Sequence, residues 1–73
     1  MARVLHLLKR DDPLALRLAA EQRAAGDEVT VVLLPGAPDL APPAGVRRRR
    51  VPDEQSWEAL LEQIFEADQV ITW

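Results

Sequence analysis

The sequence contains no cysteine and a single histidine, His6. Without cysteine the chain can form no disulfide, no thiolate metal site and no thiol nucleophile. One histidine makes a zinc site within one protomer unexpected. No apolar run approaches the ~20 residues that span a bilayer, and no signal peptide opens the chain. We therefore expect no metal, no cofactor and a cytoplasmic location.

The chain is short, and its composition is that of a folded protein. Its 73 residues are 48% hydrophobic and 29% charged, which predicts one ordered domain over residues 1–73 rather than a disordered segment. A domain of this size buries only ~60% of the surface that its unfolded chain exposes. We therefore expect few side chains to be available for a functional site.

Charge is distributed unevenly along the chain. Residues 1–50 hold all nine basic residues and six acidic ones, whereas residues 51–73 hold six acidic residues and no Lys or Arg. The net charge of −3 makes the whole chain a poor candidate for neutralising nucleic-acid phosphates. The asymmetry indicates two opposite surfaces that meet within the protomer or across an interface, or a distribution that serves solubility alone.

Four segments have the composition of strands. Two of them, Val4–Leu8 and Glu28–Leu34, are apolar on both faces, which is typical of buried parallel strands. Val46–Val51 contains four arginines and is either an exposed loop or an edge strand, since charge discourages edge pairing. Gln69–Trp73 predicts a short final strand.

Two segments are expected to be helical. Asp12 caps a helix over Pro13–Ala25, and Gly26 follows it as a residue able to take positive φ. The second helix begins with Asp53 or Ser56 as its cap. We expect the first helix to face the sheet with Leu14, Ala15, Leu18 and Ala19. We expect the second to do so with Trp57, Leu60, Leu61, Ile64 and Phe65, while Glu58, Glu62, Gln63 and Glu66 point outward.

The order β-α-β-loop-β-α-β predicts an α/β fold with a small, mostly parallel four-stranded sheet. Suppose that the first strand is central, with the second strand on one side of it and the last strand on the other. The arginine strand then lies outermost, beside the second strand. In this order, right-handed crossovers place one helix on each face of the sheet. One helix per face leaves apolar sheet surface that a second subunit would bury. The alternative is that the Pro-rich segment 35–45, Trp57 and Trp73 cover it locally.

No set of residues points to catalysis. Asp11 and Asp12 are adjacent, but Asp12 is explained as a helix cap, and no spacing links Ser56 to His6 as in a nucleophile–base pair. Glu62 and Glu66 would make a poor cation site, because hard cations take more oxygen ligands. The loop Leu34–Pro38 lies where α/β sheets bind ligands, although its prolines remove amide donors. We expect a protein that is not an enzyme.

Five residues are candidates for an interface. Trp73 is a large terminal side chain, best explained if it packs in its own core or against a partner. Trp57, in the second helix, is the other tryptophan, and tryptophan is enriched at the centres of interfaces. His6 is either a buried, hydrogen-bonded histidine or a pH-sensitive interface residue. Arg48 and Arg50 share one side of a strand and could bind an acidic partner; contact of the run Arg47–Arg50 with tRNA is the less expected alternative.

Three segments together resemble the DsrH/TusB family of the DsrE-like superfamily. Val4–Arg10 is similar to the start of that family, an apolar strand with a Leu-His pair and a following basic residue. Gly26–Glu28, leading through a strand to Pro35-Gly36, is similar to its Gly-Asp segment. Ser56–Glu58 and Asp68–Trp73 resemble its aromatic-led helix and closing Val-x-Ser-Trp. The segments cover about half of the chain.

The departures from the family are specific. Pro35 stands where the family usually has Asp, Thr72 stands in the place of Ser, and the chain is shorter in its middle and lacks the Cys that some members carry. The resemblance implies a DsrE-like fold and assembly with homologous DsrE/TusD-like and DsrF/TusC-like subunits or with itself. In such sulfur-relay complexes a Cys of another subunit carries persulfide sulfur, toward tRNA thiolation or sulfur oxidation. The alternative is a stand-alone ligand-binding or oligomeric module.

Overall fold

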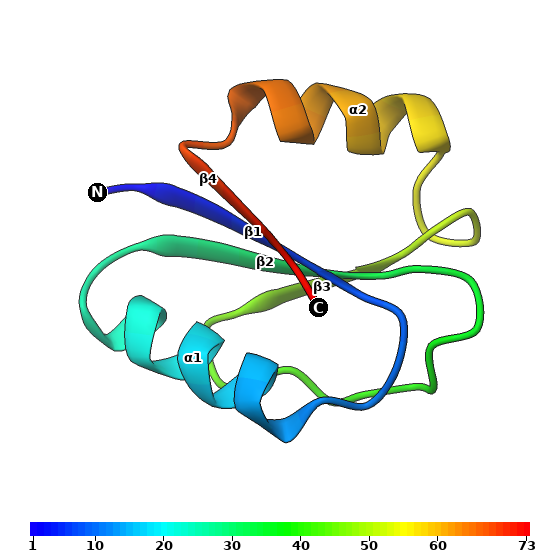
Figure 1. Cartoon of the computed structure of the whole chain (residues 1–73). Coiled ribbons are helices and arrows are strands. Elements are labelled where there is room, and N and C mark those ends of the chain that lie inside the picture. The colour runs from blue at the N-terminus through cyan, green and yellow to red at the C-terminus, as the bar shows by residue number, and fades with distance from the viewer.

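A four-stranded parallel sheet lies between two helices in the computed structural model, which describes residues 1–73 (Figure 1). The elements, in chain order, are β1 (Arg3–Leu8), α1 (Pro13–Ala24), β2 (Glu28–Leu33), β3 (Arg47–Arg50), α2 (Trp57–Glu66) and β4 (Gln69–Thr72). The predicted α/β class is confirmed, and the arginine segment is a strand rather than a loop. Neither helix has the length and apolar character needed to cross a membrane.

The strand order is β3-β2-β1-β4, and every neighbouring pair is parallel. This is the order that we assumed in placing the helices from the sequence, with β1 central and the arginine strand at one edge. The crossover from β1 to β2 runs toward the β3 edge, and the crossover from β3 to β4 runs back across the sheet in the opposite direction. Right-handed connections therefore place α1 and α2 on opposite faces (Figure 1). The edges are therefore β3 on one side and β4 on the other.

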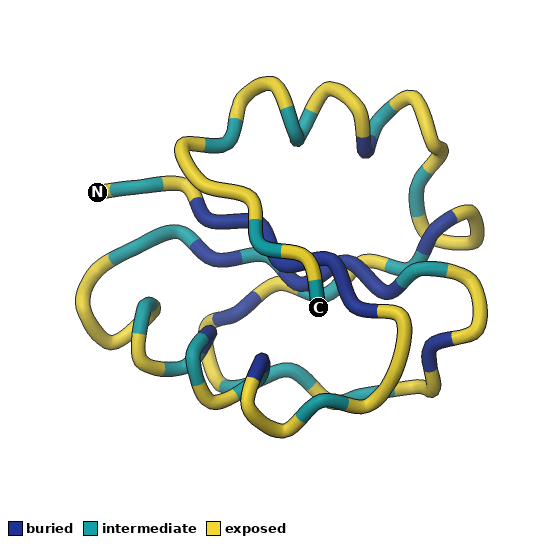
Figure 2. Tube along the Cα trace, in the orientation of Figure 1, coloured by how far each residue is buried: buried dark blue, intermediate teal, exposed yellow.

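The central strands are buried on both faces by the chain itself. Every residue from Val4 to Leu8 has an exposed fraction of 9% or less, and Val31 to Leu33 have 1% or less. Figure 2 shows β1 and β2 as the buried centre and β4 as mostly exposed. The expectation that these strands leave uncovered apolar surface is therefore wrong. Part of the reason is the Pro-rich segment, from which Ala37 is buried and Leu40 packs on the core.

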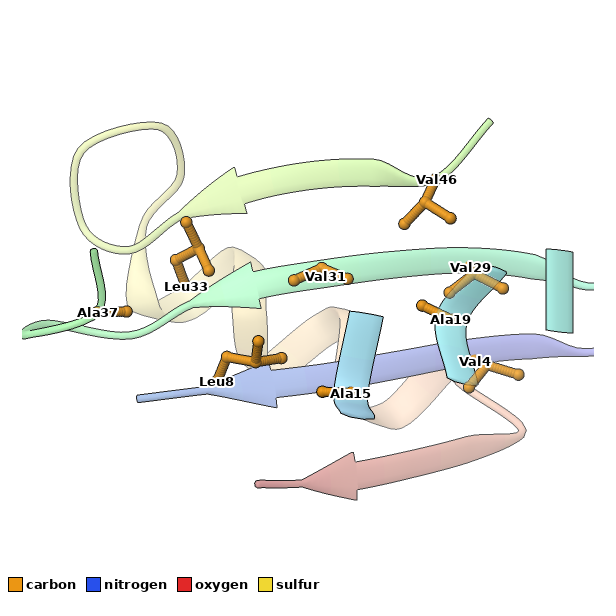
Figure 3. Packing of buried hydrophobic residues seen from close by; sticks show 9 residues of the cluster. All are labelled: Val4, Leu8, Ala15, Ala19, Val29, Val31, Leu33, Ala37 and Val46. Atoms are coloured by element: carbon orange, nitrogen blue, oxygen red, sulfur yellow. The ribbon is translucent and has the colours of Figure 1, made fainter. Parts of the chain in front are cut away.

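Helix α1 packs closely on the sheet because its inner residues are small. Ala15 and Ala19 are buried beside Val4, Val29 and Leu8 in the larger core cluster (Figure 3). As predicted, Asp12 caps the helix, with Oδ1 accepting from the N–H of Leu14 at 3.1 Å, and Gly26 has φ +99° after its end. Leu14 was expected to face the sheet but is 62% exposed.

Helix α2 contacts the sheet through a narrower face than its periodicity predicts. Ser56, not Asp53, is the cap, with its hydroxyl accepting from the N–H of Ala59 at 3.1 Å. Leu60 is buried against Leu5, Leu7, Val32 and Val51, and Ile64 packs beside it. Three members of the expected stripe face solvent, namely Trp57, Leu61 and Phe65. Gln63, which we expected to point outward, accepts from Nε2 of Gln55 at 2.7 Å.

Candidate docking surface

His6 is buried at the centre of β1 and connects three elements. Its exposed fraction is 0%, and Nε2 lies 2.7 Å from Oε1 of Gln22 in α1. Nδ1 accepts a hydrogen bond from Nε1 of Trp73 at 2.9 Å. Because an indole N–H can only donate, Nδ1 must accept, and the ring proton therefore lies on Nε2, directed at Gln22. The expectation of a buried, hydrogen-bonded histidine is confirmed.

Trp73 is held against the core by this histidine. Its ring stacks on the imidazole with centroids 6.0 Å apart and planes 25° from parallel, and its backbone N–H donates to the carbonyl of Leu7 at 3.0 Å. Trp73 is half-buried. Of the two alternatives for Trp73, packing in its own core is the one observed. His6 does not reach the surface, so any influence on an interface would pass through Trp73.

The outer part of α2 exposes three large apolar side chains. Trp57 is 53% exposed, Leu61 53% and Phe65 80%. Their i, i+4, i+8 spacing places them on one flank of the helix. The opposite flank carries Gln63 and Glu66, which face a cavity over β2 and β3. The apolar flank therefore turns toward β4 and outward.

The α1 helix repeats this arrangement on the other face of the sheet. Arg23 lies on the β3 side, next to Gly45, and Gln22 reaches His6 on the opposite flank. Helical spacing places Leu14 on the same flank as Gln22. The exposed large apolar side chains of the protein are Met1, Leu14, Trp57, Leu61, Phe65 and Val70. Leu14, Trp57, Leu61 and Val70 lie on this side of the molecule, which we call the β4 side, whereas Phe65 lies farther out on α2.

The arginines of β3 are engaged within the chain. Arg48 and Arg50 share one side of the strand and both bind Asp39, with Nη1 of Arg48 at 2.7 Å and Nη2 of Arg50 at 3.3 Å from Oδ1. The hydrogen bond from Arg50, and then the charge of Arg48, hold the pKa of the Asp39 carboxyl below its ordinary value. Arg50 also donates to the carbonyl of Ala37 at 2.9 Å.

The remaining two arginines lie on the other side of β3. Nη1 of Arg47 is 3.8 Å from Oε1 of Glu28, and Arg49 has no carboxylate partner. Strand geometry thus splits the run between two faces, as the sequence predicts. Arg48 and Arg50, our interface candidates, are half-buried and committed to Asp39. The run presents no row of four free guanidinium groups.

Neither of the two best-defined cavities coincides with a predicted site. One of about 250 Å³ lies between α2 and the amino ends of the strands, lined by Arg3, Glu28, Thr30, Arg47 and Glu66 among others. It is smaller than the roughly 300–1,000 Å³ of typical ligand pockets, and its charges already pair with each other. The loop Leu34–Pro38 lines neither this cavity nor the second of about 160 Å³.

The residues considered for chemistry do not converge. Ser56 caps α2 on one face of the sheet, whereas His6 belongs to the cluster on the other face. No group of three His, Cys, Asp or Glu side chains comes together in a metal-binding arrangement. Two important residues were missed from the sequence, Gln22 and Asp39. Gln22 follows Ala15 and Ala19 at helical spacing and could have been placed on the inner face, whereas nothing local marks Asp39.

Comparisons with known proteins add no relative. No family model, no curated protein and no solved structure matches the chain.

Proposed function

We propose that this chain is a non-catalytic subunit of a DsrE-like sulfur-relay assembly and that it acts by docking onto other subunits. The observation that carries the proposal is the exposure of large apolar side chains along α2, of which Phe65 is the most exposed at 80%. Monomeric proteins rarely gather such residues in one region unless another molecule covers them. The resemblance to the DsrH/TusB family in three segments supplies the class of assembly.

The outer surface of α2 is the part that we assign to the relay partner. Phe65 is 80% exposed there, and helical spacing places Glu62 beside it and Glu58 two turns away on the same flank. Neither carboxylate has an ion pair within the chain, whereas Glu66 pairs with Arg3 at 3.5 Å. An apolar anchor with unpaired acidic neighbours fits a pocket rimmed by Lys or Arg.

The partner, rather than this chain, would carry the sulfur. Persulfide chemistry needs a thiol, and the sequence has none. The role of the chain would be to shape and stabilise the site of a Cys-bearing homologous subunit, in a relay that ends in tRNA thiolation or sulfur oxidation. Such a role demands a stable surface more than a reactive one.

The test is affinity capture of the tagged chain from its native cell, with the bound proteins identified by mass spectrometry. We expect a Cys-bearing DsrE-like protein, and we expect Phe65→Ala to reduce its recovery at least about tenfold, a typical loss for an interface anchor. Leu14→Ala is the matched control, since Leu14 is also well exposed but lies on α1. Absence of such a protein, or equal loss with both variants, contradicts the proposal.

A further inference from the structure

Strand β4 is an open sheet edge that carries neither charge nor proline. It is the outermost strand on its side, and its residues, Gln69 to Thr72, carry no charge. The other edge, β3, consists of four arginines. An unpaired edge is a template for another strand unless charge, proline or a covering segment blocks it. Of the two edges, only β4 can meet a copy of itself without bringing like charges together.

The backbone of β4 is self-complementary. The N–H of Trp73 donates to the carbonyl of Leu7, and hydrogen-bonding direction alternates along a strand. Val70 and Thr72 therefore direct their N–H and C=O groups away from β1, toward the open edge. In an antiparallel pair with its two-fold axis at Ile71, each Val70 lies opposite the second copy's Thr72. Both pairs are then hydrogen-bonded pairs, which gives four backbone hydrogen bonds.

The helices of two such copies would meet across the same axis. A two-fold axis perpendicular to the sheet keeps both α2 helices on one face. Each α2 lies over its own β1, and the two β1 strands would be three strand spacings apart, about 14 Å. That exceeds the roughly 8–10 Å between ordinary packed helices, so only large side chains can fill the gap. Trp57 and Leu61 are the large side chains on that flank.

Charge at the ends of the sheet also fits this pairing. Lys9 follows β1 two residues after Leu7, which is the partner of Thr72, so the two-fold axis sets Lys9 level with the second copy's Asp68. Lys9 has no ion pair within its own chain. Antiparallel association therefore sets this cationic group at the same end of the sheet as the second copy's Asp68, two strand spacings or about 10 Å away, twice in each dimer.

We propose that the β4 side binds a second copy of this chain, forming a two-fold dimer with one continuous eight-stranded sheet. The β4 strands pair at its centre, and Trp57 and Leu61 pack across the axis. The proposal goes beyond docking to a relay subunit and leaves Phe65, Glu58 and Glu62 on the outer surface of the dimer. Association with the relay partner and with the second copy thus use different residues.

The test is the oligomeric state of the purified chain, measured by sedimentation velocity and light scattering. The wild type is expected to have twice the mass of the chain. Thr72→Pro removes the outward N–H without breaking the ladder to β1, and proline is tolerated at such edge positions. Symmetry removes two hydrogen bonds at once, so we expect the dimer Kd to rise about 10- to 100-fold. Thr72→Ser keeps the N–H and is the matched control, expected to remain dimeric.

Two further measurements keep the outcome decisive. If Thr72→Pro does not fold, hydrogen exchange of the wild type replaces it: the amides of Val70 and Thr72 should become protected as concentration rises. A wild type that stays monomeric, or edge amides whose exchange is independent of concentration, overturns the dimer. Capture of the relay partner by a monomeric chain would refute this inference alone, whereas a dimer that captures no partner would refute only the proposed function.

Discussion

The two edge strands of the sheet, β3 and β4, differ in the charge that they carry. At β3, four arginines face both sides of the strand, and three of them bind carboxylates of the same chain. At β4 there is no charge, and the nearby helix flanks expose Trp57, Leu61 and Leu14. At the β3 edge, charges that pair within the chain complete the fold. The β4 edge, which has no such charges, is left open to a further molecule.

The largest effect is expected where the β4 side is joined to the core. His6→Ala removes a fully buried ring and leaves Nε1 of Trp73 without an acceptor. Cavity formation and lost hydrogen bonds together should lower the free energy of unfolding by about 3–4 kcal/mol. The core of a domain this small rarely supplies more than about 3–5 kcal/mol, so the loss should be large. Urea unfolding followed by circular dichroism measures it.

Gln22→Ala is the control for His6, because it removes one hydrogen bond to the ring and leaves the ring itself in place. A cost of about 1 kcal/mol is expected. If His6→Ala were no more destabilising than Gln22→Ala, the histidine would not be the anchor of Trp73 and β4.

Two adjacent leucines of α2 test whether the exposed flank serves association rather than folding. Leu60 is 5% exposed, whereas Leu61 is 53% exposed. We expect Leu60→Ala to cost about 2–3 kcal/mol of unfolding free energy and Leu61→Ala less than about 0.5 kcal/mol in a monomer. Both are measured by urea unfolding at low protein concentration. Equal costs would show that Leu61 packs on its own sheet, and the contrast between the two flanks would disappear.

At the β3 edge, removing the charge of Arg50 should lower stability more than removing the charge of the neighbouring Arg49. Arg50→Met keeps an unbranched apolar stem but loses the hydrogen bonds to Ala37 and Asp39, at a cost of about 1 kcal/mol. Arg49→Met removes a guanidinium that has no carboxylate partner, so its effect should stay within about 0.5 kcal/mol. Thermal unfolding of the two variants distinguishes them. An equal loss at both positions would mean that the arginines act only through overall charge.

Much of the fold could be predicted from the sequence because its signals are local. Strands β1 and β2 are apolar on both faces, and the caps Asp12 and Ser56 stand at the helix starts. β3 stayed undecided because a row of arginines suits an edge strand and a loop equally well. The strand order could not be derived from the order of the elements alone. Once β1 is taken as central, the right-handedness of the two crossovers places the helices on opposite faces.

The candidate site was predicted less well, for a physical reason. Helical periodicity identifies an apolar stripe, but not how much of it a narrow sheet can contact. Over four strands α2 buries Leu60 and packs Ile64, and the rest of the stripe faces solvent. The sealing of the sheet by Ala37 and Leu40 was missed because segment 35–45 has no periodicity to place it. Contacts such as His6 with Trp73 join residues 67 positions apart and have no local signal.

The smallest expected effect concerns acid stability at the β3 edge. Hydrogen bonding from Arg50 and the charge of Arg48 lower the pKa of Asp39 in the folded state. A lowered folded-state pKa stabilises the fold above the unfolded pKa, about 3.9 for Asp, and this contribution is lost as pH falls through the lower folded value. The side chain of Asp39 is 80% exposed, so solvent screening keeps the effect small.

Asp39→Asn should therefore flatten the loss of stability below about pH 4, the ordinary range of Asp. Asp53→Asn, which removes a carboxylate without an ion pair, should leave that loss unchanged. The urea midpoint as a function of pH and an NMR titration of the Asp39 carboxyl carbon measure the effect. High salt should move the Asp39 pKa back toward its ordinary value, because exposed ion pairs are screened. An Asp39 that titrates at its ordinary pKa at low salt would show that the arginines of β3 are solvated rather than paired, and the contrast between the two edges would lose its electrostatic basis.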